Sequence, residues 1–191
     1  MKKLKKQVSL FVVLVMAFAF VPSCRAQVTT DERKSQTRNV SDGVVSAIRS
    51  MTAKRAAHTA TLLGNGKVLI AGGFVGNGGG LSSAEVFDPT TTTFTSAENM
   101  TVARAGHTAT PLPNGKVLIS GGYNGDYLNS AEVYDPATNR FASAGRMVTA
   151  RSGHVATLLK DGKVLLVGGV GTGWTFLSDA ELFDPQTNTF T

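Results

Sequence analysis

HTATLLGNGKVLIAGG spans His58 to Gly73, and the same pattern occurs twice more along the chain. HTATPLPNGKVLISGG runs from His107 to Gly122, and HVATLLKDGKVLLVGG runs from His154 to Gly169. In each copy an Asn-Gly or Asp-Gly pair separates a Thr-rich half from an apolar half, which predicts two short strands joined by a two-residue turn with positive φ at both positions. A recurring unit of this kind sets the architecture of the whole chain.

The repeat extends well beyond the quoted stretch. Met51, Met100 and Met147 occupy equivalent positions at spacings of 49 and 47 residues, and they divide the chain into units 51–99, 100–146 and 147–191. All variation in length falls in the loop after the Gly pair, which has 10, 8 and 10 residues (74–83, 123–130 and 170–179). This spacing describes a constant frame with one adjustable loop.

Each unit contains signals for four strands. In the first unit the strands are expected at 58–63, 67–71, 84–87 and 94–97, and Asp-Pro after the third strand predicts a turn. The apolar second strand is expected to be covered on both faces. The Gly pairs should permit close backbone approach where that strand ends: Gly72, Gly73, Gly121, Gly122, Gly168 and Gly169. Outside the N-terminal leader no helical period is present, so the predicted class is all-β.

The chain resembles the kelch repeat family. The resemblance rests on the Gly pairs and on Ala-Glu-[Val/Leu]-[Phe/Tyr]-Asp-Pro at 84–89, 131–136 and 180–185, and it covers residues 51–191. It implies β-propeller blades, here three four-stranded antiparallel blades in an incomplete ring. The family usually has Trp as the last aromatic residue of a blade, whereas this chain has Phe94, Phe141 and Phe190.

Three blades do not close a ring, since propellers typically have about four to eight. Residues 44–50 resemble a fourth strand that precedes the first unit, and in propellers of this kind such a strand commonly latches the ring. We therefore expect a partial product of a longer propeller. The alternative is a homodimer that completes a six-blade ring, and an isolated three-blade stack is the least favoured arrangement.

Residues 1–26 have the layout of a signal peptide, with four lysines before an apolar stretch of 14 residues, 8–21. As a helix that stretch would reach about 21 Å, short of a bilayer core of about 30 Å. Residues 21–24 resemble a lipobox that ends at Cys24, and the alternative is cleavage before Gln27. We expect an exported protein (periplasmic, outer-membrane-anchored or extracellular) with a flexible spacer at 27–43 and membrane contact only through the leader or a lipid on Cys24.

The charge of the body argues against nucleic-acid binding. The chain has 19 Lys and Arg against 13 Asp and Glu, but five of the basic residues lie before residue 27. The repeats are therefore nearly neutral and offer no basic face for phosphates.

Two sets of recurring polar residues have alternative interpretations. Arg55, Arg104 and Arg151 precede each His by three residues and are candidates for gripping a ligand carboxylate, or for structural ion pairs with the recurring Glu85, Glu132 and Glu181. His58, His107 and His154 share one phase and could face a metal, but we favour a structural hydrogen bond of each within its own blade. No metal or other cofactor is predicted.

The variable loops are the favoured ligand-binding positions, because a repeat frame is constant and its loops differ. The candidates are aromatic and polar: Tyr123, Asn124, Asp126, Tyr127, Trp174 and Phe176. They suit a protein or glycan surface, although Trp174 has the alternative of packing over its own blade. We predict an exported, non-catalytic binding scaffold.

The obvious model for an enzymatic function is galactose oxidase, which is built on a kelch propeller and has a copper site with a tyrosine cross-linked to cysteine. The blades of this chain contain no cysteine, and Tyr123, Tyr127 and Tyr134 all lie in one repeat. The alternative function is therefore a fragment of a galactose-oxidase-like or other carbohydrate-active enzyme that lacks the catalytic residues.

Overall fold

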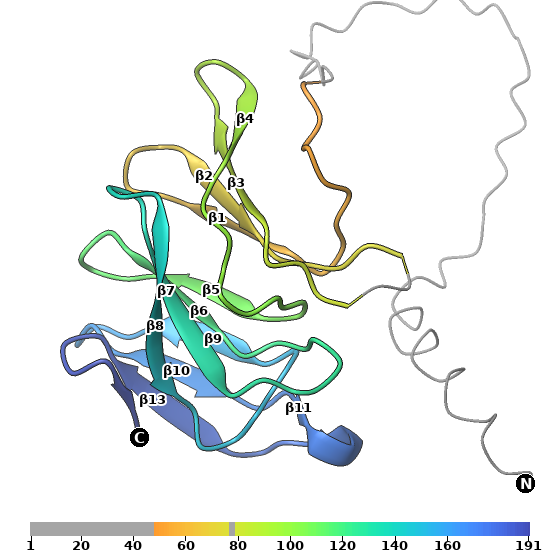
Figure 1. Ribbon diagram of the computed structural model, residues 1–191. Coiled ribbons are helices and arrows are strands. Elements are labelled where there is room, and N and C mark those ends of the chain that lie inside the picture. The colour runs from red at the N-terminus through yellow and green to blue at the C-terminus, as the bar shows by residue number, and fades with distance from the viewer. Residues whose placement is uncertain (1–47, 77–78) are drawn as a thin grey trace, which may run out of the picture. The chain divides into compact units, whose positions relative to one another are not determined.

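The computed structural model describes residues 48–76 and 79–191, which fall within one compact unit from Val45 to Thr191. Three four-stranded antiparallel sheets, the blades, follow one another in chain order (Figure 1). Blade 1 has β1 (Thr59–Leu62), β2 (Val68–Ala71), β3 (Ala84–Asp88) and β4 (Thr93–Ser96). Blade 2 has β5 (Thr108–Pro111), β6 (Val117–Ser120), β7 (Ser130–Asp135) and β8 (Arg140–Arg146). Blade 3 has β9 (Val155–Leu158), β10 (Val164–Val167), β13 (Ala180–Asp184) and β14 (Thr189–Phe190).

The predicted all-β class and the three kelch-type blades are confirmed. A fourth, two-stranded ribbon, β11 (Val170–Gly171) and β12 (Thr175–Phe176), encloses the 3-10 turn η1 (Thr172–Trp174) in the variable loop of blade 3. In the described part of the chain no helix has the length and apolarity needed to cross a membrane. The leader at 1–26, Cys24 and the spacer at 27–43 lie outside the described residues, as does most of segment 44–50, whose residues 48–50 are exposed and in no strand.

The hairpin between the first two strands of each blade differs from the prediction. Only the second residue of each predicted pair has positive φ: Gly66 at 80°, Gly115 at 80° and Gly162 at 87°. Leu63 N–H donates to Lys67 O at 2.8 Å, so the loop contains three residues, and Asn65 Oδ1 accepts from Lys67 N–H at 3.1 Å. That side-chain bond holds Asn65 in an ordinary turn conformation, and a bulge at Gly66 then restores the strand pairing.

The Gly pairs do permit close approach, and the approach is between blades. The first glycine of each pair lies against the next blade: a Cβ on Gly72 would clash with Arg104 O of blade 2, and a Cβ on Gly121 would stand 2.5 Å from Arg151 O of blade 3. The N–H of the second glycine donates to the same carbonyl, from Gly73 to Arg104 O at 2.9 Å and from Gly122 to Arg151 O at 2.8 Å. A side chain at Gly72 or Gly121 would therefore separate neighbouring blades.

The hydrophobic core lies between blades. Leu69 and Val86 of blade 1 pack in one cluster with Ile119 and Tyr134 of blade 2. Leu118 on the opposite face of blade 2 packs with residues of blade 3 that include Val164, Leu166 and Phe183. Every residue of β6 is buried, which agrees with the prediction that the second strand is covered on both faces; its last residue, Ser120, is polar.

Candidate functional site

The recurring arginines are bound inside the blades. Their side chains are 0% exposed, and each donates to a glutamate of its own blade: Arg55 to Glu85 at 2.8 Å, Arg104 to Glu132 at 2.9 Å and Arg151 to Glu181 at 2.9 Å. Arg104 also donates to the carbonyl oxygens of Gly121 and Ser130. A ligand would reach these guanidinium groups only if the ion pairs opened, so the structure gives them the structural role and not the carboxylate-binding one.

Each glutamate also holds the segment that enters its blade. Glu85 accepts from Thr52 N–H at 2.8 Å, and Glu132 accepts from Thr101 N–H at the same distance. Burial opposes the ionisation of Glu85, but the hydrogen bonds from Thr52 and Arg55 outweigh it and hold the pKa of Glu85 below its usual value. In blade 3, Asp179 is a second carboxylate on Arg151, at 2.7 Å.

His107 and His154 bond between blades, which corrects for these two the prediction of a bond within each blade. His107 Nε2 hydrogen-bonds to Thr59 Oγ1 of blade 1 at 2.9 Å, and His154 Nε2 hydrogen-bonds to Thr108 Oγ1 of blade 2 at 3.0 Å. Burial, and then the charge of Arg104, lowers the pKa of His107 to about 3, so the imidazole is neutral. Among the described residues no group of three His, Cys, Asp or Glu is placed to hold a metal ion.

The variable loops of blades 2 and 3 bring three predicted aromatic residues together. Tyr123 and Tyr127 pack edge to face with ring centroids 5.3 Å apart, and Tyr127 packs against Trp174 at 6.4 Å and 87°. Phe176 follows in β12 and is 78% exposed, while Trp174 is 45% exposed. Trp174 therefore contacts the neighbouring blade, whereas the alternative interpretation packed it over its own. We call Tyr123, Tyr127, Trp174 and Phe176 the aromatic surface.

Trp174 has an unusual backbone. Its φ is 64°, directly after Gly173 with a φ of 71°, inside the turn that β11 and β12 enclose. A bulky residue at positive φ is a rare and costly conformation, and such strain concentrates at functional positions. Sequence repeats identify this loop as variable, but they carry no signal for the strained φ.

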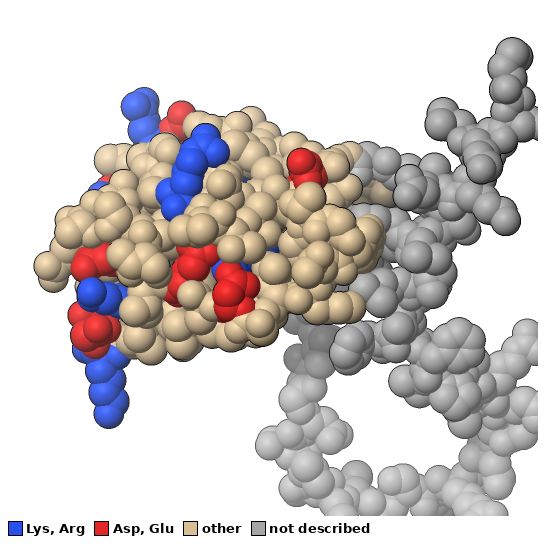
Figure 2. Space-filling model, turned by 90° about the horizontal axis from the view of Figure 1, so that it is seen from below, with Lys and Arg blue, Asp and Glu red and all other residues tan. Residues whose placement is uncertain are grey.

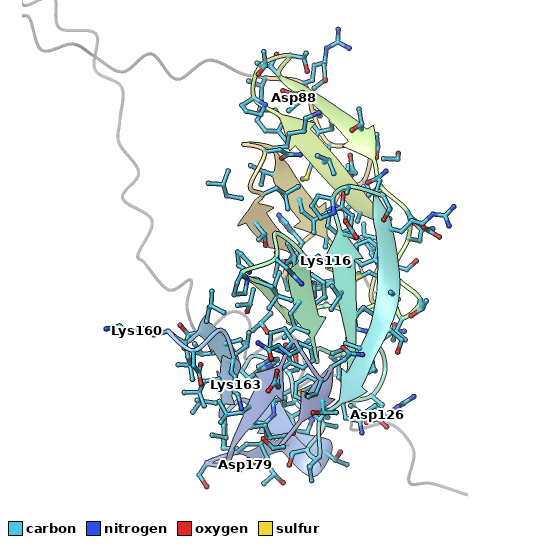
Figure 3. The ribbon with its side chains drawn as sticks, turned by 90° about the vertical axis from the view of Figure 1, so that its left-hand side faces the viewer. Asp88, Lys116, Asp126, Lys160, Lys163 and Asp179 are labelled. Atoms are coloured by element: carbon cyan, nitrogen blue, oxygen red, sulfur yellow. The ribbon has the colours of Figure 1, made fainter. Side chains whose placement is uncertain are left out.

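The two polar candidates of the same loops have different roles. Asn124 Oδ1 accepts from Gly80 N–H of blade 1 at 2.8 Å, so it links the variable loops of blades 1 and 2. Asp126 Oδ1 accepts from Tyr127 N–H at 2.8 Å, and the Asp126 side chain is exposed at the edge of the domain (Figure 3). Asp126 thus places a carboxylate beside the aromatic surface, and Asn124 contributes to the loop framework.

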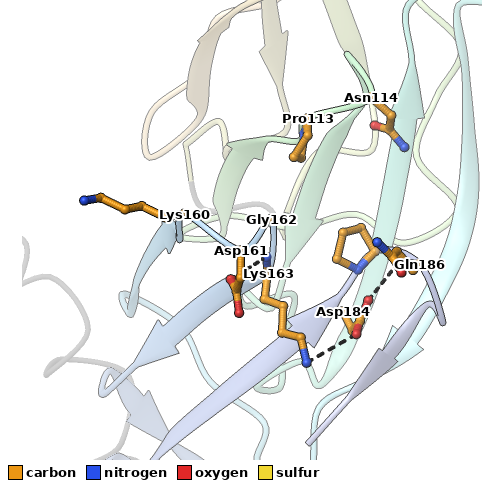
Figure 4. A pocket seen from close by; sticks show the side chains of 9 residues that line it. Pro113, Asn114, Lys160, Asp161, Gly162, Lys163, Asp184 and Gln186 are labelled. Carbon is orange, nitrogen blue, oxygen red and sulfur yellow. Dashed lines mark hydrogen bonds and ion pairs between the residues drawn. The ribbon is translucent and has the colours of Figure 1, made fainter.

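Sequence reasoning missed a hollow of about 450 Å³ between the hairpin tips of blades 2 and 3 (Figure 4). Pro113, Lys160 and Gln186 are among its lining residues. Lys163 pairs with Asp184 at its wall at 3.4 Å, and the same pair recurs as Lys67–Asp88 and Lys116–Asp135, both at 3.1 Å. This repetition identifies the pairs as part of the blade frame. On the face that Figure 2 shows, basic and acidic side chains are interspersed over a mostly uncharged surface.

Comparison with known proteins agrees with this geometry. Residues 55–101, 103–148 and 150–191 match the family described as the Kelch motif. A solved structure of YjhT is 17% identical with a TM-score of 0.62, over 75% of this chain and 52% of YjhT. A fungal alcohol oxidase of the AA5 family, in complex with copper, is 17% identical with a TM-score of 0.55, over 72% of this chain and 30% of the oxidase. The chain thus spans about half the length of YjhT. No curated protein matches by sequence.

Proposed function

The chain belongs to the Kelch motif family, and on that premise we propose that it is a non-catalytic scaffold that binds a partner protein through the aromatic surface. The repeated polar residues hold the blades together, since the arginines, the glutamates and two of the histidines form bonds within or between blades. The variable loops are left to present side chains outward. This division of roles makes the loops the functional part of the molecule.

The observation that carries the proposal is the conformation of Trp174. A positive φ of 64° costs stability at a tryptophan, and the residue is nonetheless held with nearly half of its surface exposed. Its ring packs on Tyr127 from the neighbouring blade, so two blades jointly fix the indole. Rigid, partly exposed aromatic side chains are the usual energetic centre of a protein interface.

A protein partner is favoured over a glycan by the shape of the surface. Phe176 is 78% exposed and therefore protrudes, as an anchor for a pocket on a partner does. Sites for small ligands are usually concave and enclose most of the ligand. The carboxylate of Asp126 beside the rings would also serve a glycan, so glycan binding is the alternative.

The similarity to the oxidase concerns the fold alone. The described residues are not placed to hold a copper ion such as the oxidase binds. The three histidines lie in three separate blades, and two of them are engaged between blades. No group of three potential metal-ligating residues is present in the described ranges. No catalytic step is therefore part of the proposal.

We also propose that the scaffold acts outside the cytoplasm, because residues 1–26 have the charge and apolar layout of a signal peptide. Intact mass of the mature protein separates the two forms of processing. A lipid-sized addition on Cys24 indicates an anchored form, a new N-terminus at Gln27 indicates a released form, and an intact Met1 in the cytosol contradicts export.

Site-specific photo-crosslinking in the producing cell tests the binding proposal. A benzophenone amino acid at Phe176 should capture a defined protein, whereas the same group at Leu62, which is 67% exposed on blade 1, should not capture it. A glycan array probed with the purified chain provides the second arm. Binding on the array without a cross-linked protein would identify the ligand as a glycan. Failure of both experiments would contradict the proposal.

A further inference from the structure

One sheet surface of blade 3 has no partner within the described residues. We call it the outer face: Val155, Thr157, Leu165, Val167 and Leu182. Its residues pair across the strands in two rows. Val155 pairs with Val167 in one row; in the other, Leu165 of β10 pairs with Thr157 on one side and with Leu182 on the other. The equivalent row is covered in the other blades, where Ala71 and Ser120, which correspond to Val167, are 0% exposed, whereas Val167 is 42% and Val155 69% exposed.

The two interfaces between blades show what normally covers such a face. In both, the incoming blade brings a histidine against a threonine hydroxyl, His107 onto Thr59 and His154 onto Thr108. In the second interface Ser120 adds another hydroxyl, 3.4 Å from His154 Nε2. The hydroxyl is the partner that makes a buried neutral imidazole tolerable at this position.

Blade 3 lacks both hydroxyls. Val155 occupies the position of Thr59 and Thr108, and Val167 occupies the position of Ser120. A histidine brought against this pair would bury its Nε2 without a hydrogen-bond partner, whereas an aliphatic side chain would extend the valine row. The outer face thus differs in chemistry from the faces that receive histidine.

We propose that the outer face receives a β-sheet whose facing strand carries an aliphatic side chain opposite Val155 and Val167, where blades 2 and 3 carry histidine. Continuity with the two existing interfaces makes a sheet the occupant, and the valine pair specifies its chemistry. Blade 1 of a second copy fits poorly, because it brings His58 to that position. A six-blade homodimer built by this contact is therefore disfavoured.

An appended probe blade tests the specificity of the face. Thr191 is equivalent to Ala142, so a copy of residues 143–191 joined after Thr191 continues the repeat in register. Two proteins are compared, one with the histidine of the appended copy retained and one with that histidine replaced by leucine. The leucine form should show the higher urea midpoint, with an unfolding constant lower by about tenfold. A matched control, V155T/V167S in the natural blade 3, should reverse the order.

A second measurement decides the case in which the appended blade does not fold. Sedimentation equilibrium of the full chain compares His58 and His58→Leu, each with and without V155T/V167S. The matched combinations, leucine with the valines and histidine with Thr-Ser, should associate more tightly than the mismatched ones. If the matched combinations do not exceed the mismatched ones in either experiment in which the proteins fold, the proposal is overturned.

Discussion

Thr59 in β1 and His107 before β5 are 48 residues apart, yet Thr59 Oγ1 hydrogen-bonds to His107 Nε2 at 2.9 Å and joins blade 1 to blade 2. Thr108 and His154 repeat the contact one blade later. Both imidazoles are buried and neutral in the fold. The contacts between neighbouring blades therefore involve side chains that can take up a proton once the chain unfolds.

The first prediction is a loss of stability below about pH 6.5. Burial and then Arg104 lower the pKa of His107 to about 3, and burial and then Arg151 lower that of His154 to about 4. Unfolded imidazoles bind protons from about pH 6.5 downward, whereas the folded ones stay neutral, so acid favours unfolding. The stability is fully present at higher pH and falls by about 1.4 kcal/mol per pH unit for each histidine until the folded pKa is reached.

Urea midpoints between about pH 7.5 and about pH 5 measure this slope above the range where carboxylates titrate. His107→Gln keeps a polar group near Thr59 and does not titrate, so it should reduce the slope by roughly half. A slope that is unchanged in this variant, or a wild type whose stability is flat across the range, would contradict the assignment.

The second prediction concerns the buried ion pair of blade 2. Glu132→Gln leaves the guanidinium of Arg104, which is 0% exposed, without a charged partner. We expect the free energy of unfolding to fall by about 3–5 kcal/mol. The control is Glu98→Gln, since Glu98 is 53% exposed and pairs with Arg140 at 3.5 Å, and it should change stability by less than about 0.5 kcal/mol. Equal effects in chemical denaturation would contradict the structural role.

The third prediction is a stabilising substitution. Thr92 has a φ of 55° in the turn after β3, where blades 2 and 3 have Asn139 and Asn188 at 59° and 58°. Asparagine tolerates this conformation better than a β-branched residue. Thr92→Asn should raise the free energy of unfolding by about 0.5–1 kcal/mol, measured by urea denaturation. Thr91→Asn, one residue earlier and not at positive φ, should be neutral, and a gain there of the same size would remove the explanation.

These residues also show what sequence could and could not predict. Matched recurrence of Arg104 and Glu132 was enough to predict their pairing, because a buried charge needs a partner in every copy. Recurrence of the histidines fixed their equivalence but not the direction of their bonds, since a repeat period says nothing about which neighbour a side chain faces. The hairpin prediction was wrong because the bond from Lys67 N–H to Asn65 Oδ1 favours a three-residue loop.

The aromatic surface was predicted only as a set of loop residues. Alignment of the repeats places Tyr127 and Trp174 in equivalent loops of adjacent blades, but it left open whether Trp174 packs over its own blade. The positive φ of Trp174, which sets how its ring packs on Tyr127, belongs to the turn at 171–174 of blade 3. The other two copies do not contain the sequence of that turn, so a single sequence offers no internal comparison for it.

The last prediction separates function from stability at Trp174. Trp174→Gly removes the indole and relieves a φ of 64°, so the free energy of unfolding should stay constant or rise by up to about 1 kcal/mol. Capture of the partner through a benzophenone group at Phe176 should fall by about tenfold or more, because truncating an interface centre typically costs at least about 2 kcal/mol. The matched control is Val148→Gly, at an apolar residue that is 84% exposed outside the aromatic surface, and it should leave capture intact. Unfolding of the Trp174→Gly variant would show that the indole serves the fold, and partner capture at the wild-type level would show that it is not the centre of the interface.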